Sequence, residues 1–123
     1  MKKILSILAA SLALGACSKS ASDNYVGQWQ MDQNGKPWQF ISSLYKSANK
    51  STPLPIITIS KSGDVYLVKD GNDSYLKMEQ YCPTGATLKD TKLVCSPEFE
   101  LTFDSTTGTL LTTSLGGFTK ISK

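Results

Sequence analysis

The fold is decided by a stretch in the middle of the chain, IITISKSGDVYLV, which spans residues 56–68. Two runs rich in β-branched and aromatic residues flank Ser62-Gly63, and a small polar residue followed by glycine is typical of a tight turn. The stretch therefore predicts a β-hairpin. A turn centred on Ser62-Gly63 pairs Ile59 with Tyr66 across the two strands.

Similar runs continue along the rest of the chain. Tyr25–Met31 and Phe99–Phe103 alternate apolar and polar residues, and Ser74–Tyr81 is a further candidate strand. A loop at residues 106–108 pairs Phe103 with Leu111. We count about eight short strands joined by tight turns, so the sequence predicts an all-β fold, a small antiparallel meander that forms a barrel or a sandwich.

Asn34-Gly35 follows the first of these strands and is a strong signal for a two-residue hairpin. Folding the chain about this pair sets Met31 opposite Trp38 and Trp29 opposite Phe40. The large apolar groups of both strands then share one face, so the turn residues and the alternation agree. The hairpin is the preferred prediction for this region.

A competing interpretation is a helix that begins at Pro37, with apolar residues repeating at Trp38, Ile41, Tyr45 and Ala48. With the hairpin, Ser42–Pro55 becomes a long surface loop that contains at most a short helical turn. The residues expected to form the core are Trp29, Trp38, Phe40, Ile57, Ile59, Tyr66, Val68, Phe99, Leu101, Phe103, Leu111 and Phe118.

The chain has 123 residues, a net charge of +3, and no histidine; its basic residues are all lysine. Without histidine there is no imidazole base, Ser-His-Asp triad or histidine metal site. Without arginine there is no bidentate reader of phosphate or guanine. We therefore expect a protein that is not an enzyme, with no metal, no cofactor and no nucleic-acid partner.

Residues 1–16 have the features of an export signal, a short basic start followed by an apolar run and small residues. The apolar run is shorter than the roughly 20 residues that span a bilayer. Leu14-Gly15-Ala16-Cys17 resembles the lipobox of bacterial lipoproteins. That resemblance implies cleavage before Cys17 and acyl chains, including palmitate, on this residue. The alternatives are an ordinary signal cleaved at the same place and a buried helix with a core cysteine.

Cleavage there removes Lys2 and Lys3 and lowers the net charge from +3 to +1. Residues 17–24 then form the lipidated end and a polar tether, and residues 25–123 form a single β-barrel-like domain. Ser18 after the lipidated cysteine is typical of lipoproteins sorted to the outer membrane, facing the periplasm or the cell surface. The expected membrane attachment is through lipid.

Cys82 and Cys95 are the cysteines that remain after lipidation of Cys17. An even number of cysteines in an exported chain predicts a structural disulfide. In the chain-entropy model a loop of this size adds about 3 kcal/mol to the free energy of unfolding. No C-x-x-C motif supports a redox role.

Gly27-Gln28-Trp29, at the start of the first strand, resembles the G-x-W of lipocalin-type barrels. In that family the tryptophan packs at the closed end of the barrel, commonly under a late arginine. This chain has no arginine, and Lys120 in the last strand is the candidate replacement. The resemblance implies a structural role for Gly27 and Trp29, and a barrel of this size holds either a small ligand or only side chains.

Ser62-Gly63-Asp64-Val65-Tyr66 is similar to the S-G-x-x-Y loop of bacterial lysozyme inhibitors. These inhibitors are small β-barrel proteins that are either periplasmic or lipid-anchored. In that family the serine side of the loop enters the lysozyme cleft. The second loop motif of the family has no match here. Ser-Gly at a hairpin tip is also ordinary turn chemistry.

The sequence thus favours a lipid-anchored envelope lipoprotein with a binding or interaction role. Its expected partners, besides the membrane, are an envelope protein or a small apolar ligand. The alternative is an inhibitor of a lysozyme-type cell-wall hydrolase that uses Ser62, Gly63 and Tyr66.

Overall fold

The computed structural model describes residues 24–122, so the predicted signal, Cys17 and nearly all of the tether lie outside the described residues. The strands are β1 (Gly27–Met31), β2 (Ile56–Ser62), β3 (Val65–Asp70), β4 (Thr87–Lys89), β5 (Lys92–Ser96), β6 (Phe99–Asp104), β7 (Thr109–Thr112) and β8 (Gly117–Ser122). The helical segments are α2 (Lys36–Ser47) and a 3₁₀ turn, η1 (Met78–Gln80).

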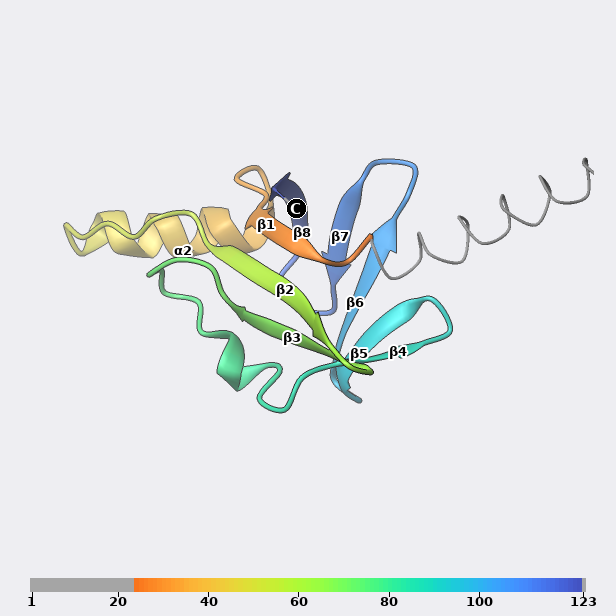
Figure 1. The fold of residues 1–123 in the computed structure, drawn as a ribbon. Coiled ribbons are helices and arrows are strands. Elements are labelled where there is room, and N and C mark those ends of the chain that lie inside the picture. Colours follow the sequence, from red (N-terminus) through yellow and green to blue (C-terminus); the bar gives the residue numbers. More distant parts are fainter. Residues whose placement is uncertain (1–23, 123) are drawn as a thin grey trace, which may run out of the picture.

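The strands form one antiparallel sheet that curls into a nearly closed barrel (Figure 1). Each strand pairs with a neighbour in the chain, and β8 returns to pair with β1. The gap between β3 and β4 is bridged by backbone hydrogen bonds of 2.8 and 2.7 Å between Tyr66 and Ala86. The predicted all-β antiparallel meander is confirmed, and its architecture is the barrel. Closure leaves few unpaired strand edges.

Side chains that alternate along the strands fill the barrel. In β1 every second residue is buried, namely Gly27, Trp29 and Met31, as a strand with one inward face requires. The core prediction is confirmed for Trp29, Ile57, Ile59, Tyr66, Val68, Phe99, Leu101 and Phe118, which are all buried. Buried residues outside that prediction include Tyr25, Met31, Leu76, Met78, Leu93 and Leu110.

The predicted hairpin at Asn34-Gly35 is wrong, because these residues lead into α2 instead of a second strand. Gly35 is the N-cap and Pro37 lies in the first turn, where its missing N–H breaks no helical hydrogen bond. The competing helical interpretation is therefore correct. Phe40, expected in the core, is 65% exposed, and Trp38 is half-buried.

Because β1 pairs with β2 and β8, the predicted contacts of Trp29 are also different. Trp29 lies opposite Ile57 of β2 and Lys120 of β8, and not opposite Phe40. The segment Ser42–Pro55, expected to be a loop, is helical as far as Ser47. The long-range partners of a central strand outweigh a local turn signal here.

The β2–β3 hairpin is present, but its register differs from the prediction by two residues. Ile59 pairs with Val68, and Ser62 pairs with Val65, so the turn residues are Gly63 and Asp64. A shift of two residues keeps each side chain on the same face of the sheet. The predicted core residues of this hairpin are buried for that reason.

The β6–β7 hairpin is displaced by one residue, which reverses the faces. Phe103 pairs with Leu110 and not with Leu111. Leu110 is fully buried, whereas Leu111 is 44% exposed, so the prediction of Leu111 as a core residue is wrong.

The predicted strand at Ser74–Tyr81 is also wrong. This segment is irregular and ends in η1, and β4 completes the barrel instead. The Asp70 carboxylate accepts a hydrogen bond of 2.6 Å from the backbone N–H of Met78, and the Met78 side chain is fully buried. These contacts fold the segment against the end of β3.

Candidate functional site

The G-x-W residues lie at the start of β1, and the backbone explains the glycine. Gly27 has φ 142°, a conformation that residues with a side chain rarely adopt. Trp29 is fully buried, and its indole N–H donates a 3.0 Å hydrogen bond to the carbonyl oxygen of Tyr25. The Trp29 ring also meets Phe103 edge to face, with centroids 6.1 Å apart. Trp29 thus packs inside the barrel, and the predicted role of Gly27 and Trp29 at its closed end stays a prediction.

Lys120 lies directly across the β1–β8 pair from Trp29. Its ammonium nitrogen is 5.4 Å from the centroid of the Trp29 ring. A cation in this position is attracted to the electron-rich face of the indole. Lys120 therefore covers a face of the Trp29 ring; whether it takes the role of the family's arginine stays a prediction.

Tyr25 forms a clamp that the sequence analysis missed. Its hydroxyl donates a 2.5 Å hydrogen bond to the carbonyl oxygen of Thr91 and accepts one of 3.0 Å from the N–H of Phe103. Burial raises the pKa of Tyr25, and the hydrogen bond from Phe103 opposes that shift. The clamp ties the entry of β1 to the β4–β5 turn and to β6. Only the short spacing to Trp29 hinted at it in the sequence.

The residues Ser62, Gly63 and Asp64, here called the β2–β3 tip, are all exposed. Gly63 has φ +64°, and a side chain at this position would meet nothing within 4 Å. Tyr66, in contrast, is 2% exposed and points into the barrel. The structure thus brings Ser62 and Gly63 together at the surface and separates Tyr66 from them.

Contacts at its base hold the β2–β3 tip. The ammonium group of Lys61 lies 5.7 Å from the centroid of the Tyr66 ring. Tyr66 is also hydrogen-bonded to Ala86 across the barrel closure. The tip is therefore a short exposed turn on a base that is fixed by packing and by paired backbone groups.

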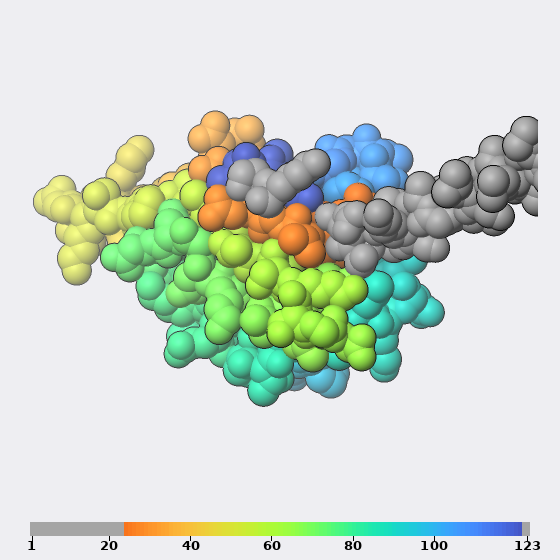
Figure 2. Space-filling model, in the orientation of Figure 1, coloured from red at the N-terminus to blue at the C-terminus, as the bar shows by residue number. Residues whose placement is uncertain are grey.

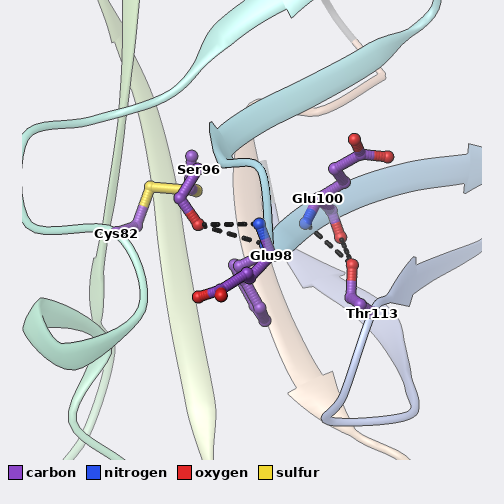
Figure 3. Close-up of a disulfide and its surroundings, with 7 residues drawn as sticks. Cys82, Ser96, Glu98, Glu100 and Thr113 are labelled. Carbon is purple, nitrogen blue, oxygen red and sulfur yellow. Dashed lines mark hydrogen bonds between the residues drawn. A yellow bond between two sulfur atoms is a disulfide. The ribbon is translucent and has the colours of Figure 1, made fainter.

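Cys82 and Cys95 form the predicted disulfide, with their Cα atoms 5.0 Å apart. The bond joins the segment after η1 to β5. Figure 3 shows it beside Ser96, whose hydroxyl oxygen accepts hydrogen bonds from the N–H groups of Glu98 and Phe99, at 3.2 and 3.1 Å. The disulfide and this turn hold together the segments beside the closure between β3 and β4.

Two pockets of the described surface lie on the outside of the barrel, whose interior is filled by side chains. One of about 140 Å³ lies beside β3 and the disulfide, lined by Leu67, Val68, Lys69, Asp70, Glu79, Cys82, Pro83 and Gly85. A second, of about 150 Å³, lies between α2 and the chain that follows it, lined by Trp38, Ser42, Tyr45, Lys46, Lys50, Ser51 and Thr52. Both are smaller than the roughly 300 Å³ at which pockets for drug-sized ligands begin.

α2 extends beyond the barrel (Figure 1), and the yellow segment that includes it stands out from the surface in Figure 2. None of its side chains is buried. Trp38 stacks on Tyr75, with ring centroids 6.5 Å apart, and Tyr45 meets the same ring. The opposite side carries Phe40 and Leu44, which are 65% and 50% exposed. These two residues are here called the outer face of α2.

Within residues 24–122, no three or more His, Cys, Asp or Glu side chains cluster in a way that could hold a metal ion. In the same part of the chain, no helix has the length and apolar character needed to cross a membrane.

Comparison with known proteins adds no relative. No protein family model matches the chain, and no curated protein or solved structure matches it.

Proposed function

We propose that this chain is a lipid-anchored protein of the bacterial cell envelope whose barrel domain binds a protein partner and catalyses no reaction. The observation that carries the proposal is the filled interior of the barrel. Its centre is occupied by side chains that are at most 2% exposed, among them Trp29, Tyr66, Leu101 and Phe118. Binding therefore falls to the outer surface, and a protein partner is favoured over a small apolar ligand.

The anchorage rests on the sequence. Leu14-Gly15-Ala16-Cys17 follows an export signal, and the resemblance to the lipobox implies acylation of Cys17. Several acyl chains attach a protein stably, whereas one chain attaches it only weakly. Ser18 favours the outer membrane. Replacing Cys17 with serine is expected to release the protein from the membrane fraction, and unchanged membrane association would refute the anchor.

The best candidate for the contact with a partner is the β2–β3 tip. Ser62 and Asp64 are exposed there, and the base below them is held by buried Tyr66. A turn that is already ordered loses little conformational freedom when it binds, which favours affinity. The outer surface of the barrel thus offers an exposed and preorganised contact at this point.

Site-specific photo-crosslinking in intact cells tests this proposal. A photoreactive residue at Ser62 is expected to capture one defined envelope protein. The matched control is Thr106, an exposed residue in the turn between β6 and β7. Equal capture from both positions, or none from Ser62, would count against the tip as the binding contact.

A second candidate function is inhibition of a lysozyme-type cell-wall hydrolase. The observation that favours it is the exposure of Ser62 and Gly63 on a protruding turn, the part of the S-G-x-x-Y loop that enters the cleft in the similar inhibitors. The mature protein is then expected to inhibit at least one member of a muramidase panel. A bulky Ser62→Trp change should abolish inhibition while Thr106→Trp should not. No inhibition at micromolar protein would end this candidate.

A further inference from the structure

The charges of this chain are unevenly distributed along the sequence. Residues 33–63 contain four lysines and no acidic residue, whereas residues 64–104 contain eight acidic residues and four lysines. The first of these segments includes all of α2. The helix itself carries Lys36 and Lys46 and no acidic residue, and the nearest acidic residue before it is Asp32, on a mature chain that is close to neutral as a whole.

α2 combines this charge with exposed apolar groups. Lys36, Phe40 and Leu44 are spaced four residues apart, so they form one row along the helix. Lys46 lies in the last turn and Lys50 follows the helix, and all three lysines are exposed. Lys36 thus lies beside Phe40, whereas Lys46 and Lys50 line the pocket next to Trp38 and Tyr45. Helices with large apolar residues on one face and lysines on the rest of their surface are typical of segments that lie in a membrane interface.

We propose that α2 lies in the plane of an anionic phospholipid surface, with Phe40 and Leu44 in the boundary between headgroups and acyl chains. Lys36, in the same row, then reaches the lipid phosphates, because a long lysine stem can extend from an apolar contact to a charged layer. Lys46 and Lys50, on the side of Trp38 and Tyr45, add a longer-range attraction to the anionic surface. A helix of twelve residues is about 18 Å long, so it lies on a bilayer and does not cross it.

This inference rests on the proposed lipid anchor, which limits where the domain can be. Ser18–Asn24, fully extended, reach at most roughly 23 Å from the acylated cysteine. The domain is then never far from the bilayer. The tether enters β1 at its start and α2 follows the end of β1, so a second contact at α2 fixes how the barrel is turned relative to the membrane. A protein partner on the outer face would need acidic groups to match these lysines, and phospholipid supplies them over the whole surface.

A tryptophan reporter tests the contact directly. The acylated mature protein is reconstituted into vesicles of phosphatidylethanolamine and phosphatidylglycerol with brominated acyl chains, which quench nearby tryptophan. Phe40→Trp places the reporter on the outer face of α2. Leu111→Trp is the matched control, because Leu111 is a similarly exposed apolar residue on β7. The added fluorescence of Phe40→Trp is expected to be quenched at least about threefold more strongly than that of Leu111→Trp.

The lipid charge and the lysines provide the second measurement. Replacing phosphatidylglycerol with phosphatidylcholine, or adding salt, should weaken the quenching of Phe40→Trp. The triple change Lys36→Gln, Lys46→Gln and Lys50→Gln should do the same. The control triple, at Lys69, Lys77 and Lys89, should not. Loss of quenching equal in both triples would overturn the assignment of these lysines.

Two results distinguish failure of this inference from failure of the anchor. If the protein floats with the vesicles but Phe40→Trp is quenched no more than Leu111→Trp, the anchor stands and the α2 contact is refuted. Such a result would leave the outer face of α2 to a protein partner. If the protein does not float with vesicles at all, both the anchor and the contact are refuted.

Discussion

β1 and α2 follow each other in the chain and use similar aromatic and apolar residues, but they bury them very differently. β1 places Trp29 and Met31 inside the barrel, whereas α2 buries none of its side chains and exposes Phe40 and Leu44. A central strand must fill the space between its two neighbours. The helix contacts the barrel through partly buried residues, chiefly Trp38 and Tyr45 against the Tyr75 ring. Stability is therefore concentrated in β1, and α2 is available for binding.

The two tryptophans of the chain provide the strongest test of this difference in stability, because Trp29 lies in β1 and Trp38 lies in α2. Trp29→Ala removes a fully buried ring and should lower the free energy of unfolding by about 3–5 kcal/mol. Trp38→Ala removes a half-buried ring and should cost about 1 kcal/mol. Urea unfolding under non-reducing conditions measures both. Equal losses would show that α2 is as much part of the core as β1.

Tyr25 offers the next largest effect. Tyr25→Phe leaves the Phe103 N–H and the Thr91 carbonyl without this partner and should cost about 1–3 kcal/mol. Tyr45 on α2 is the matched control, because its hydroxyl makes no hydrogen bond within the described residues. Tyr45→Phe is therefore expected to leave the free energy of unfolding nearly unchanged.

The same clamp predicts a dependence on pH. Burial raises the pKa of Tyr25 above its ordinary value of 10.0, so the hydroxyl stays protonated to a higher pH in the folded protein than in the unfolded chain. The contribution of Tyr25 is thus complete below pH 10 and is lost as the pH rises through the folded pKa. The alkaline loss of stability should be smaller in Tyr25→Phe. It should not vanish, because burial also raises the pKa of Tyr75. An identical alkaline profile in Tyr25→Phe and the unchanged protein would contradict this account.

The sequence predicted the antiparallel meander, as a barrel or a sandwich, because most strands carry their own signal. Alternation at Phe99–Phe103 and β-rich runs around Ser62-Gly63 identify strands and turns without knowledge of their partners. The cysteines also identified their own bond, because no other pair remained after Cys17. What failed depended on contacts between distant residues.

The failures have definite physical causes. Asn34-Gly35 suits both a hairpin and the entry to a helix, and only the pairing of β1 with β2 and β8 decides between them. The pairing of Phe103 with Leu110, one residue away from the predicted partner Leu111, depends on the conformation of the loop before Gly108. The alternation of apolar and polar residues does not determine that conformation. The Tyr25 clamp joins residues that lie far apart in the chain, so no local pattern contains it.

Lys120 gives a smaller test of the β1 region. Lys120→Gln removes the cation from the face of Trp29 and should lower the free energy of unfolding by about 0.5–1 kcal/mol. Lys120→Arg keeps a cation there and should restore most of that loss. Lys46→Gln, on α2, is the control and should leave the unfolding curve unchanged. If glutamine and arginine at position 120 behave alike, the contact with Trp29 contributes no cation–π stabilisation.

The smallest expected effect is on the outer face of α2. Changing Phe40→Gln and Leu44→Gln together should alter the free energy of unfolding by about 0.5 kcal/mol or less, because these side chains are already mostly in water and glutamine favours a helix. A small loss would show that Phe40 and Leu44 contribute little to the stability of the fold. Thermal unfolding followed by circular dichroism measures the change, with the buried Phe118→Gln as the destabilised reference. A loss close to that of Phe118→Gln would mean that Phe40 and Leu44 belong to the core, and the distinction between β1 and α2 would then have no basis.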